Sequence, residues 1–200
     1  KDNMSLGCTF IRYSEGSGIA IDHDKSRIRI LTADHVCSEQ TWEALSLIFK
    51  NEKGEYDYPT FKLVVSFYGH DYNATITKSD QENDLCLMEI HSEYAYKVKK
   101  IEVAKAKPKI GETVYSLSAP LGIASNYTRM KFHGSWSGCD SDLSDQDYCY
   151  YTIPAAPGSS GSGIFNQYGE LVSILSIAMS DFDNISGGPR QHFIDRMLKD

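Results

Sequence analysis

Short β-prone segments follow one another along most of the chain, separated by turns rich in Gly, Asp, Asn and Ser. Each is a compact run of β-branched, aromatic and aliphatic residues, and several alternate apolar and polar positions, as a half-buried strand does. The segments lie at 7–13, 16–22, 26–33, 44–50, 60–68, 73–79, 84–90, 113–119, 126–136, 147–153, 162–166 and 170–179. Many short strands at this spacing predict an all-β sandwich or barrel. Two hundred residues fit one domain, or two small lobes that share a core.

A single stretch near the C-terminus has helical periodicity. In residues 189–200, one apolar face is formed by Phe193, Ile194, Met197 and Leu198. Pro189 stands near the start, where helices tolerate proline. We therefore expect one C-terminal helix, and too few helices for an α/β-hydrolase, the scaffold that an esterase interpretation would need.

The charge pattern excludes some partners. The formal net charge is −7, and the most basic stretch, residues 97–109, is diluted by apolar residues and predicts a solvated edge. Nucleic-acid and anionic-membrane surfaces need clustered Lys and Arg, so we expect neither partner. No apolar run is long enough to span a bilayer, and residues 1–8 do not form a signal peptide. A soluble protein is expected, in the cytoplasm, in a virion or as an excised mature domain.

The five cysteines are an odd number, so at least one lacks a partner within the chain. No CxxC or Cys/His zinc spacing occurs, and we expect no metal. Cys139 and Cys149 have two interpretations: a disulfide that closes a hairpin in an oxidising compartment, or two small buried apolar side chains.

Three short motifs carry the residue types of a nucleophilic triad. His35 lies in "LTADHV" just after a predicted strand, Asp84 opens the apolar strand of "NDLCLMEI", and Ser160 lies in "PGSSGSG". The order His, Asp, Ser along the chain is one of the known triad arrangements.

Acyl transfer by a serine needs these three side chains. A hydroxyl is a poor nucleophile at neutral pH, so a base must accept its proton, and histidine suits this because its pKa lies near pH 7. A buried carboxylate then holds the imidazole in one tautomer. Small residues around Ser160 let the N–H groups of Gly158 and Ser160 approach a developing oxyanion.

Together these motifs make the sequence resemble the chymotrypsin-like serine peptidases, closest to the HtrA-like and bacterial or phage trypsin-like branch. The resemblance extends over residues 6–180 and also includes "GSGIAI", "KIGETVYSLSAPLG" and "GELVSILSIA". It implies His35 as general base, Asp84 as its orienting carboxylate and Ser160 as nucleophile. The implied fold is two antiparallel six-stranded Greek-key β-barrels, here residues 1–104 and 105–200, the second carrying the C-terminal helix.

This chain differs from the family pattern in several details. "GSGIAI" contains no cysteine and Cys37 is not adjacent to His35, so the animal-type disulfide beside the histidine is expected to be missing. No Ile-Val-Gly-Gly-like N-terminus occurs, and the chain ends after one helix. Activation through a new N-terminus and a following PDZ domain are therefore not expected.

Substrate preference follows from residues near the nucleophile. Pro154 stands where the family places the base of its primary specificity pocket, with Ala155, Leu175 and Ala178 as its walls. An uncharged base argues against cleavage after Lys or Arg and favours small or apolar residues. The backbones of Ser176 and Ala178 are expected to pair with an extended polypeptide substrate.

Three functional hypotheses remain open from the sequence. The first is a serine endopeptidase that needs no cofactor. The second is a catalytically silent member of the same fold that binds or scaffolds. The third is a viral polyprotein or maturation protease of narrow specificity.

Overall fold

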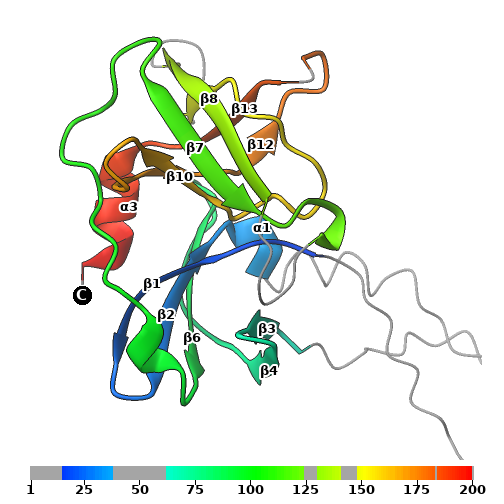
Figure 1. The fold of residues 1–200 in the computed structure, drawn as a ribbon, viewed down its shortest axis with the longest axis vertical. Helices are drawn as coiled ribbons and strands as arrows, with labels where there is room; N and C mark the ends of the chain where they lie inside the picture. The colour runs from blue at the N-terminus through cyan, green and yellow to red at the C-terminus, as the bar shows by residue number, and fades with distance from the viewer. Residues whose placement is uncertain (1–14, 38–61, 124–129, 141–147, 183, 200) are drawn as a thin grey trace, which may run out of the picture.

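The structure, a computed structural model, describes residues 15–37, 62–123, 130–140, 148–182 and 184–199 (Figure 1). Thirteen strands dominate the described part. The first lobe contains β1 (Ile19–Asp24), β2 (Arg27–Thr32), β3 (Val64–Phe67), β4 (His70–Asn73), β5 (Thr75–Asp80) and β6 (Leu85–His91). The second lobe contains β7 (Thr113–Ser118), β8 (Met130–Cys139), β9 (Tyr148–Tyr151), β10 (Gly163–Asn166), β11 (Leu171–Ile174), β12 (Ile177–Ala178) and β13 (Ser186–Pro189). The helical elements are α1 (Asp34–Cys37), α3 (Gln191–Leu198) and the 3₁₀ turns η1 (Ala95–Lys97) and η2 (Pro120–Gly122).

The strands form three antiparallel sheets. The first lobe holds a four-stranded sheet in the order β1-β2-β6-β5, with β3 and β4 as a separate hairpin. The second lobe is one seven-stranded sheet in the order β11-β10-β7-β8-β9-β13-β12. In Figure 1 the two lobes lie one above the other, with α1 between them. Among the described residues, the first lobe has six strands and the second has seven, where β12 and β13 form a further antiparallel pair.

Most predicted segments become strands. The alternating segment at 26–33 is β2, with Ile28 and Ile30 buried, and the apolar segment at 84–90 is β6, which is buried at five of its seven positions. The predicted segments 7–13 and 44–50 lie outside the described residues. Strands β4 and β13 were not predicted, because their sequences "HDYN" and "SGGP" lack β-branched residues.

The main core cluster joins the lobes and the C-terminal helix. Its buried members are Ile19, Ile21, Leu31, Leu85, Leu87, Phe165, Leu171, Ile174, Ile194 and Met197. The predicted helix is therefore present as α3, and it buries part of its apolar face between sheets of both lobes (Figure 1). Each lobe also has a cluster of its own, around Ile28 in the first and Tyr151 in the second.

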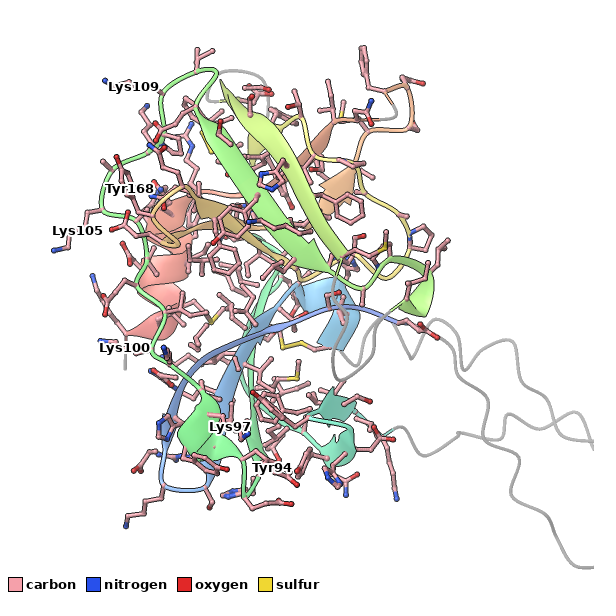
Figure 2. The ribbon with its side chains drawn as sticks, in the orientation of Figure 1. Tyr94, Lys97, Lys100, Lys105, Lys109 and Tyr168 are labelled. Atoms are coloured by element: carbon pink, nitrogen blue, oxygen red, sulfur yellow. A yellow bond between two sulfur atoms is a disulfide. The ribbon has the colours of Figure 1, made fainter. Side chains whose placement is uncertain are left out.

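The connection between the lobes bonds to both of them. Ile101 N–H donates to the carbonyl of Ile21 in the first lobe, and Ala104 N–H donates to Leu171 in the second. Lys100, Lys105 and Lys109 along this connection are exposed, as expected of a solvated edge (Figure 2). The domain boundary at residue 104 stays a prediction.

Two disulfides are present among the described residues. Cys139–Cys149 joins β8 to β9 at directly opposed positions, which is the first of the two interpretations given above. Cys37–Cys86 joins α1 to β6 and was not predicted. Cys8 lies outside the described residues. No helix in the described part is long and apolar enough to cross a membrane.

Candidate active site

Strand register brings His35 and Asp84 together. Strands β2 and β6 are antiparallel neighbours, and Thr32 at the end of β2 pairs with Cys86 near the start of β6. His35 follows Thr32 by three residues and Asp84 precedes Cys86 by two. Two side chains 49 positions apart in the sequence therefore meet at one edge of the first-lobe sheet.

The Asp84 carboxylate holds His35 at two points. His35 Nδ1 lies 2.8 Å from Asp84 Oδ2 and 3.0 Å from Oδ1, and the backbone N–H of His35 donates to Oδ1 at 2.9 Å. The side chain of His35 is 44% exposed and that of Asp84 15% exposed. The carboxylate thus fixes the ring through Nδ1 and leaves Nε2 for another partner.

This hydrogen bond also sets the basicity of the imidazole. The hydrogen bond that His35 donates to Asp84 raises the pKa of His35 above its ordinary value of 6.5, against the opposing effect of burial, and the charges of Asp84 and Asp34 raise it further. A carboxylate that accepts from Nδ1–H stabilises the protonated ring. His35 is therefore a stronger base than a free histidine.

Ser160 lies on a tight turn between the lobes. Its neighbours Ser159, Gly161 and Ser162 use their backbone N–H groups inside the second lobe, bonding to Ala156, Leu175 and Ser159 respectively. The turn also packs on η2, where Leu121 N–H donates to Pro157. Ser160 itself is half-buried.

Ser17 connects the Ser160 turn to the first lobe. Its N–H donates to Ser160 O at 2.7 Å and its hydroxyl donates to Gly158 O at 2.8 Å. Its own carbonyl accepts from Thr32 Oγ1 at 2.7 Å, three residues before His35. Sequence reasoning placed Ser17 in the predicted strand segment 16–22 and missed these contacts. In the described part no hydrogen bond joins Ser160 directly to His35.

The backbone at Gly158 has a conformation that favours glycine. Its φ is +91°, and a Cβ atom there would lie 2.8 Å from Ala119 O. Within the described part, the N–H groups of Gly158 and Ser160 donate to no backbone carbonyl, in contrast to the three neighbours named above. The two predicted oxyanion donors are therefore not occupied by bonds inside the turn.

The predicted specificity residues fall into two groups. Pro154 and Ala155 are half-buried and Leu175 is buried in the second-lobe cluster, with Ala155 packed against it. Ser176 is buried and its N–H donates to Gly187, so that donor is not free to bind substrate. Ala178 is exposed on β12, the edge strand of its sheet. Their contact with a substrate stays a prediction.

The first lobe holds α1 by two contacts that sequence reasoning missed. Asp34 accepts a hydrogen bond from Ser79 Oγ at 2.6 Å, and Cys37 is bonded to Cys86. Cys37, two residues after His35, is bonded to Cys86 rather than to a cysteine in "GSGIAI". The spacing alone held one signal, since Cys37 and Cys86 each stand two residues after a triad candidate.

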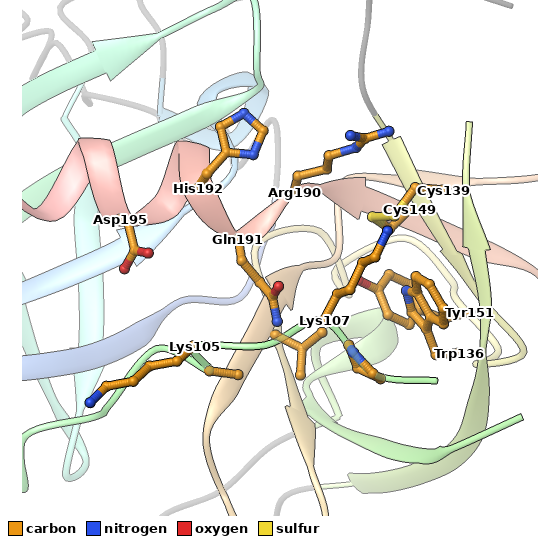
Figure 3. Close-up of a pocket in the computed structure, with 13 residues that line it drawn as sticks. Lys105, Lys107, Trp136, Cys139, Cys149, Tyr151, Arg190, Gln191, His192 and Asp195 are labelled. Carbon is orange, nitrogen blue, oxygen red and sulfur yellow. A yellow bond between two sulfur atoms is a disulfide. The ribbon is translucent and has the colours of Figure 1, made fainter. Parts of the chain in front are cut away.

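A separate pocket is lined by other residues. It has a volume of about 240 Å³ and lies between the inter-lobe connection, α3 and the Cys139–Cys149 disulfide (Figure 3). Lys105, Lys107, Arg190 and Asp195 line it, with Trp136 among the others. None of the predicted site residues lines this pocket.

The fold places the chain in the chymotrypsin-like class of double β-barrels. The active form of the Rv3671c protease of M. tuberculosis superposes with a TM-score of 0.67 at 15% identity, over 92% of this chain and 71% of that one. An inactive serine-to-alanine mutant of the same protease gives 0.66 at 14% identity, over 92% and 79%. At these identities the likeness concerns the fold alone.

The chain belongs to the trypsin-like peptidase domain family, whose model matches residues 16–174. It is 25% identical over 181 residues to the serine protease Do-like HtrA of Lactobacillus helveticus, and 27% identical over 181 residues to that of Bacillus subtilis strain 168. These alignments cover 88% and 86% of this chain but 39% and 35% of the relatives. The chain thus spans less than two fifths of their length.

Proposed function

We propose that this chain is a serine endopeptidase in which His35, Asp84 and Ser160 form the catalytic triad. The observation that carries the proposal is the pair of hydrogen bonds that the ring and backbone N–H groups of His35 donate to Asp84. They lie at the junction where Ser17 also bonds to the Ser160 turn. Family membership supports the reaction class.

In the proposed reaction, each proton has a named donor and acceptor. His35 Nε2 accepts the Ser160 hydroxyl proton as Oγ attacks the carbonyl carbon of the scissile peptide bond. The carbonyl oxygen becomes an oxyanion that accepts hydrogen bonds from the N–H groups of Gly158 and Ser160. Protonated His35 then donates to the leaving amine, the peptide C–N bond breaks and an acyl-enzyme remains. Water, deprotonated by His35, releases the acid product, and Asp84 stays ionised throughout.

We propose further that the substrate is a polypeptide cleaved after small or apolar residues. Pro154, Ala155 and Leu175 carry no charge that would select a charged side chain, and Ala178 lies on an open sheet edge where an extended peptide can add as a strand. A positional-scanning peptide library tests this. Dominance of Lys, Arg, Glu or Gln at the residue before the cleaved bond would contradict it.

A fluorophosphonate probe tests the nucleophile. The wild type should be labelled, whereas Ser160→Ala and His35→Ala should not. The matched control is Ser162→Ala, in the same turn, whose Oγ is buried and has no hydrogen-bond partner in the described part. That variant should be labelled like the wild type. A wild type that stays unlabelled while properly folded would favour the silent binding module instead.

A further inference from the structure

Helix α1 is anchored to the β5–β6 hairpin by two side chains at its two ends. Asp34 at the first position accepts a 2.6 Å hydrogen bond from Ser79 Oγ on β5. Cys37 at the last position is bonded to Cys86 on β6. Residues three apart on a helical turn lie on the same face, so both anchors hold the face of α1 that packs on the hairpin.

The two anchors form one compact unit, which we call the α1 clamp (Asp34, Ser79, Cys37 and Cys86). Ser79 and Cys86 are directly paired across β5 and β6, so the hairpin presents its two contacts side by side. An Asp34 carboxylate oxygen and both cysteine sulfurs lie within 4.8 Å of one another. Asp34, Cys37 and Cys86 are all buried, the two cysteines at 2% and 0% exposure.

The residues of the α1 clamp flank the proposed general base and its carboxylate in the sequence. His35 lies between Asp34 and Cys37, and Asp84 precedes Cys86 by two residues. The His35–Asp84 pair is itself partly solvated, with the His35 side chain 44% exposed. An ion-paired hydrogen bond at such a site is too weak to fix two segments against each other. A covalent link two residues from each partner limits how far they can separate.

We propose that the α1 clamp is a positioning device for the His35–Asp84 pair, and that full activity requires the Cys37–Cys86 disulfide. The proposal rests on the proposed function of His35. Reduction by a dithiol would transfer two electrons and two protons to the sulfurs, giving two thiols while the dithiol closes to its own disulfide. Because both cysteines are buried, reductant reaches them only when α1 or the hairpin opens. The oxidised form should therefore persist in the presence of a reductant.

The test compares matched variants of the full chain. Cys37→Ala/Cys86→Ala removes the covalent anchor, and Ser79→Ala removes only the hydroxyl that binds Asp34. Cys139→Ala/Cys149→Ala is the control, since it deletes the other disulfide, which lies on β8 and β9 of the second lobe. A merely structural role would lower the melting temperature in both double variants and leave the site chemistry alone.

Two measurements report on the site. The first is kcat and KM on an unstructured peptide, together with the rate of fluorophosphonate labelling. The second is the pKa of His35, measured by NMR, which does not require an active protein. The charges of Asp84 and Asp34 both raise this pKa. Removing the covalent anchor should lower kcat and the labelling rate about 10- to 100-fold with KM unchanged. It should also move the pKa of His35 down toward 6.5. Ser79→Ala should change both in the same direction by less, and the control should change neither.

The outcomes separate this proposal from the function it rests on. If Cys37→Ala/Cys86→Ala and Ser79→Ala both keep the wild-type labelling rate and the wild-type pKa of His35, the clamp proposal is wrong. The proposed peptidase function would not be affected by that result. A wild type without activity, whose His35 pKa still falls when the clamp is removed, would support the clamp and contradict the peptidase. If Cys37→Ala/Cys86→Ala does not fold, Ser79→Ala alone decides.

Discussion

Asp84 combines two properties that few other residues could supply at its position. Its carboxylate accepts from both the ring and the backbone of His35, and its own backbone is left-handed, with φ of +51°. Asp and Asn tolerate that conformation better than other residues with a Cβ atom. Asn is therefore the replacement that keeps the backbone while removing the charge.

Activity should be lost on acidification through a pKa above 6.5. A general base must be neutral, and the hydrogen bond from Asp84 raises the pKa of His35. Asp84→Asn should lower kcat/KM by about 10⁴-fold and move the acid limb of the pH profile to lower pH. The pH dependence of kcat/KM on a peptide substrate measures both effects.

The raised pKa of His35 also predicts the direction in which the stability of the protein changes with pH. A histidine whose pKa is raised by folding stabilises the folded state fully below 6.5, and that contribution disappears as pH rises through the folded pKa. Asp84→Asn should therefore destabilise the protein more at pH 5.5 than at pH 9. An equal loss at both pH values would contradict the role assigned to this bond.

Gly158 should not tolerate a side chain. Gly158→Ala would place a Cβ atom 2.8 Å from Ala119 O in a backbone with φ of +91°, so the turn must shift and its N–H groups move with it. The fluorophosphonate labelling rate should fall by about 10²- to 10³-fold, as when an oxyanion donor is lost. Gly111→Ala is the control, because Gly111 has φ of +82° but no atom within 4 Å of the added Cβ. Equal labelling of the two variants would contradict the prediction.

At the scale of elements, the hydrophobic pattern of the sequence was sufficient to predict the buried strands. It was insufficient for strands that form through backbone pairing alone. The alternation in β2 and the apolar run in β6 predicted both strands, and their register explains why His35 and Asp84 meet. Strand β13 carries no such pattern, since it exists by pairing with β9 and β12. The position of Cys37 and Cys86, each two residues after a triad candidate, was a hint of their link, but it could not fix the pairing because five cysteines allow many pairings.

Strand β13 uses glycine to approach β11 closely. A Cβ atom at Gly188 would lie 1.8 Å from Ile174 O, a backbone atom, whereas one at Gly187 would lie 2.9 Å from the movable side chain of Ile177. Gly188→Ala should therefore destabilise the fold by about 1–3 kcal/mol or more. Gly187→Ala should cost less. Urea unfolding of the two variants gives the order, and the reverse order would contradict this packing argument.

At the scale of the whole molecule, the lobes share one core through α3. Ile194 is fully buried in the cluster that contains Leu31 of the first lobe and Ile174 of the second. Arg196, on the same helix, pairs with Asp80 at 3.0 Å but its side chain is 63% exposed. Burial, rather than this ion pair, should hold the helix on the two sheets.

Replacing Ile194 should weaken both lobes at once. Ile194→Ala should lower the free energy of unfolding by about 2–5 kcal/mol. Arg196→Ala should lower it by less than about 1 kcal/mol. Urea unfolding followed by both tryptophan fluorescence and circular dichroism measures these values, and the two signals should change together. Separate transitions would show that the shared cluster does not couple the lobes.

The position of α3 has a consequence for biosynthesis. Ile19 and Leu31 emerge from the ribosome 160 residues or more before α3, which contributes to the same core cluster. The first-lobe sheet can pair its strands during translation, since β1 to β6 are complete by His91. Its apolar surface is fully covered only after Phe165, Leu171 and Ile174 of the second lobe, and then Ile194 and Met197 of α3, have been synthesised. The nascent chain therefore carries an incompletely covered core, attractive to chaperones, while the residues between His91 and Ile194 are added.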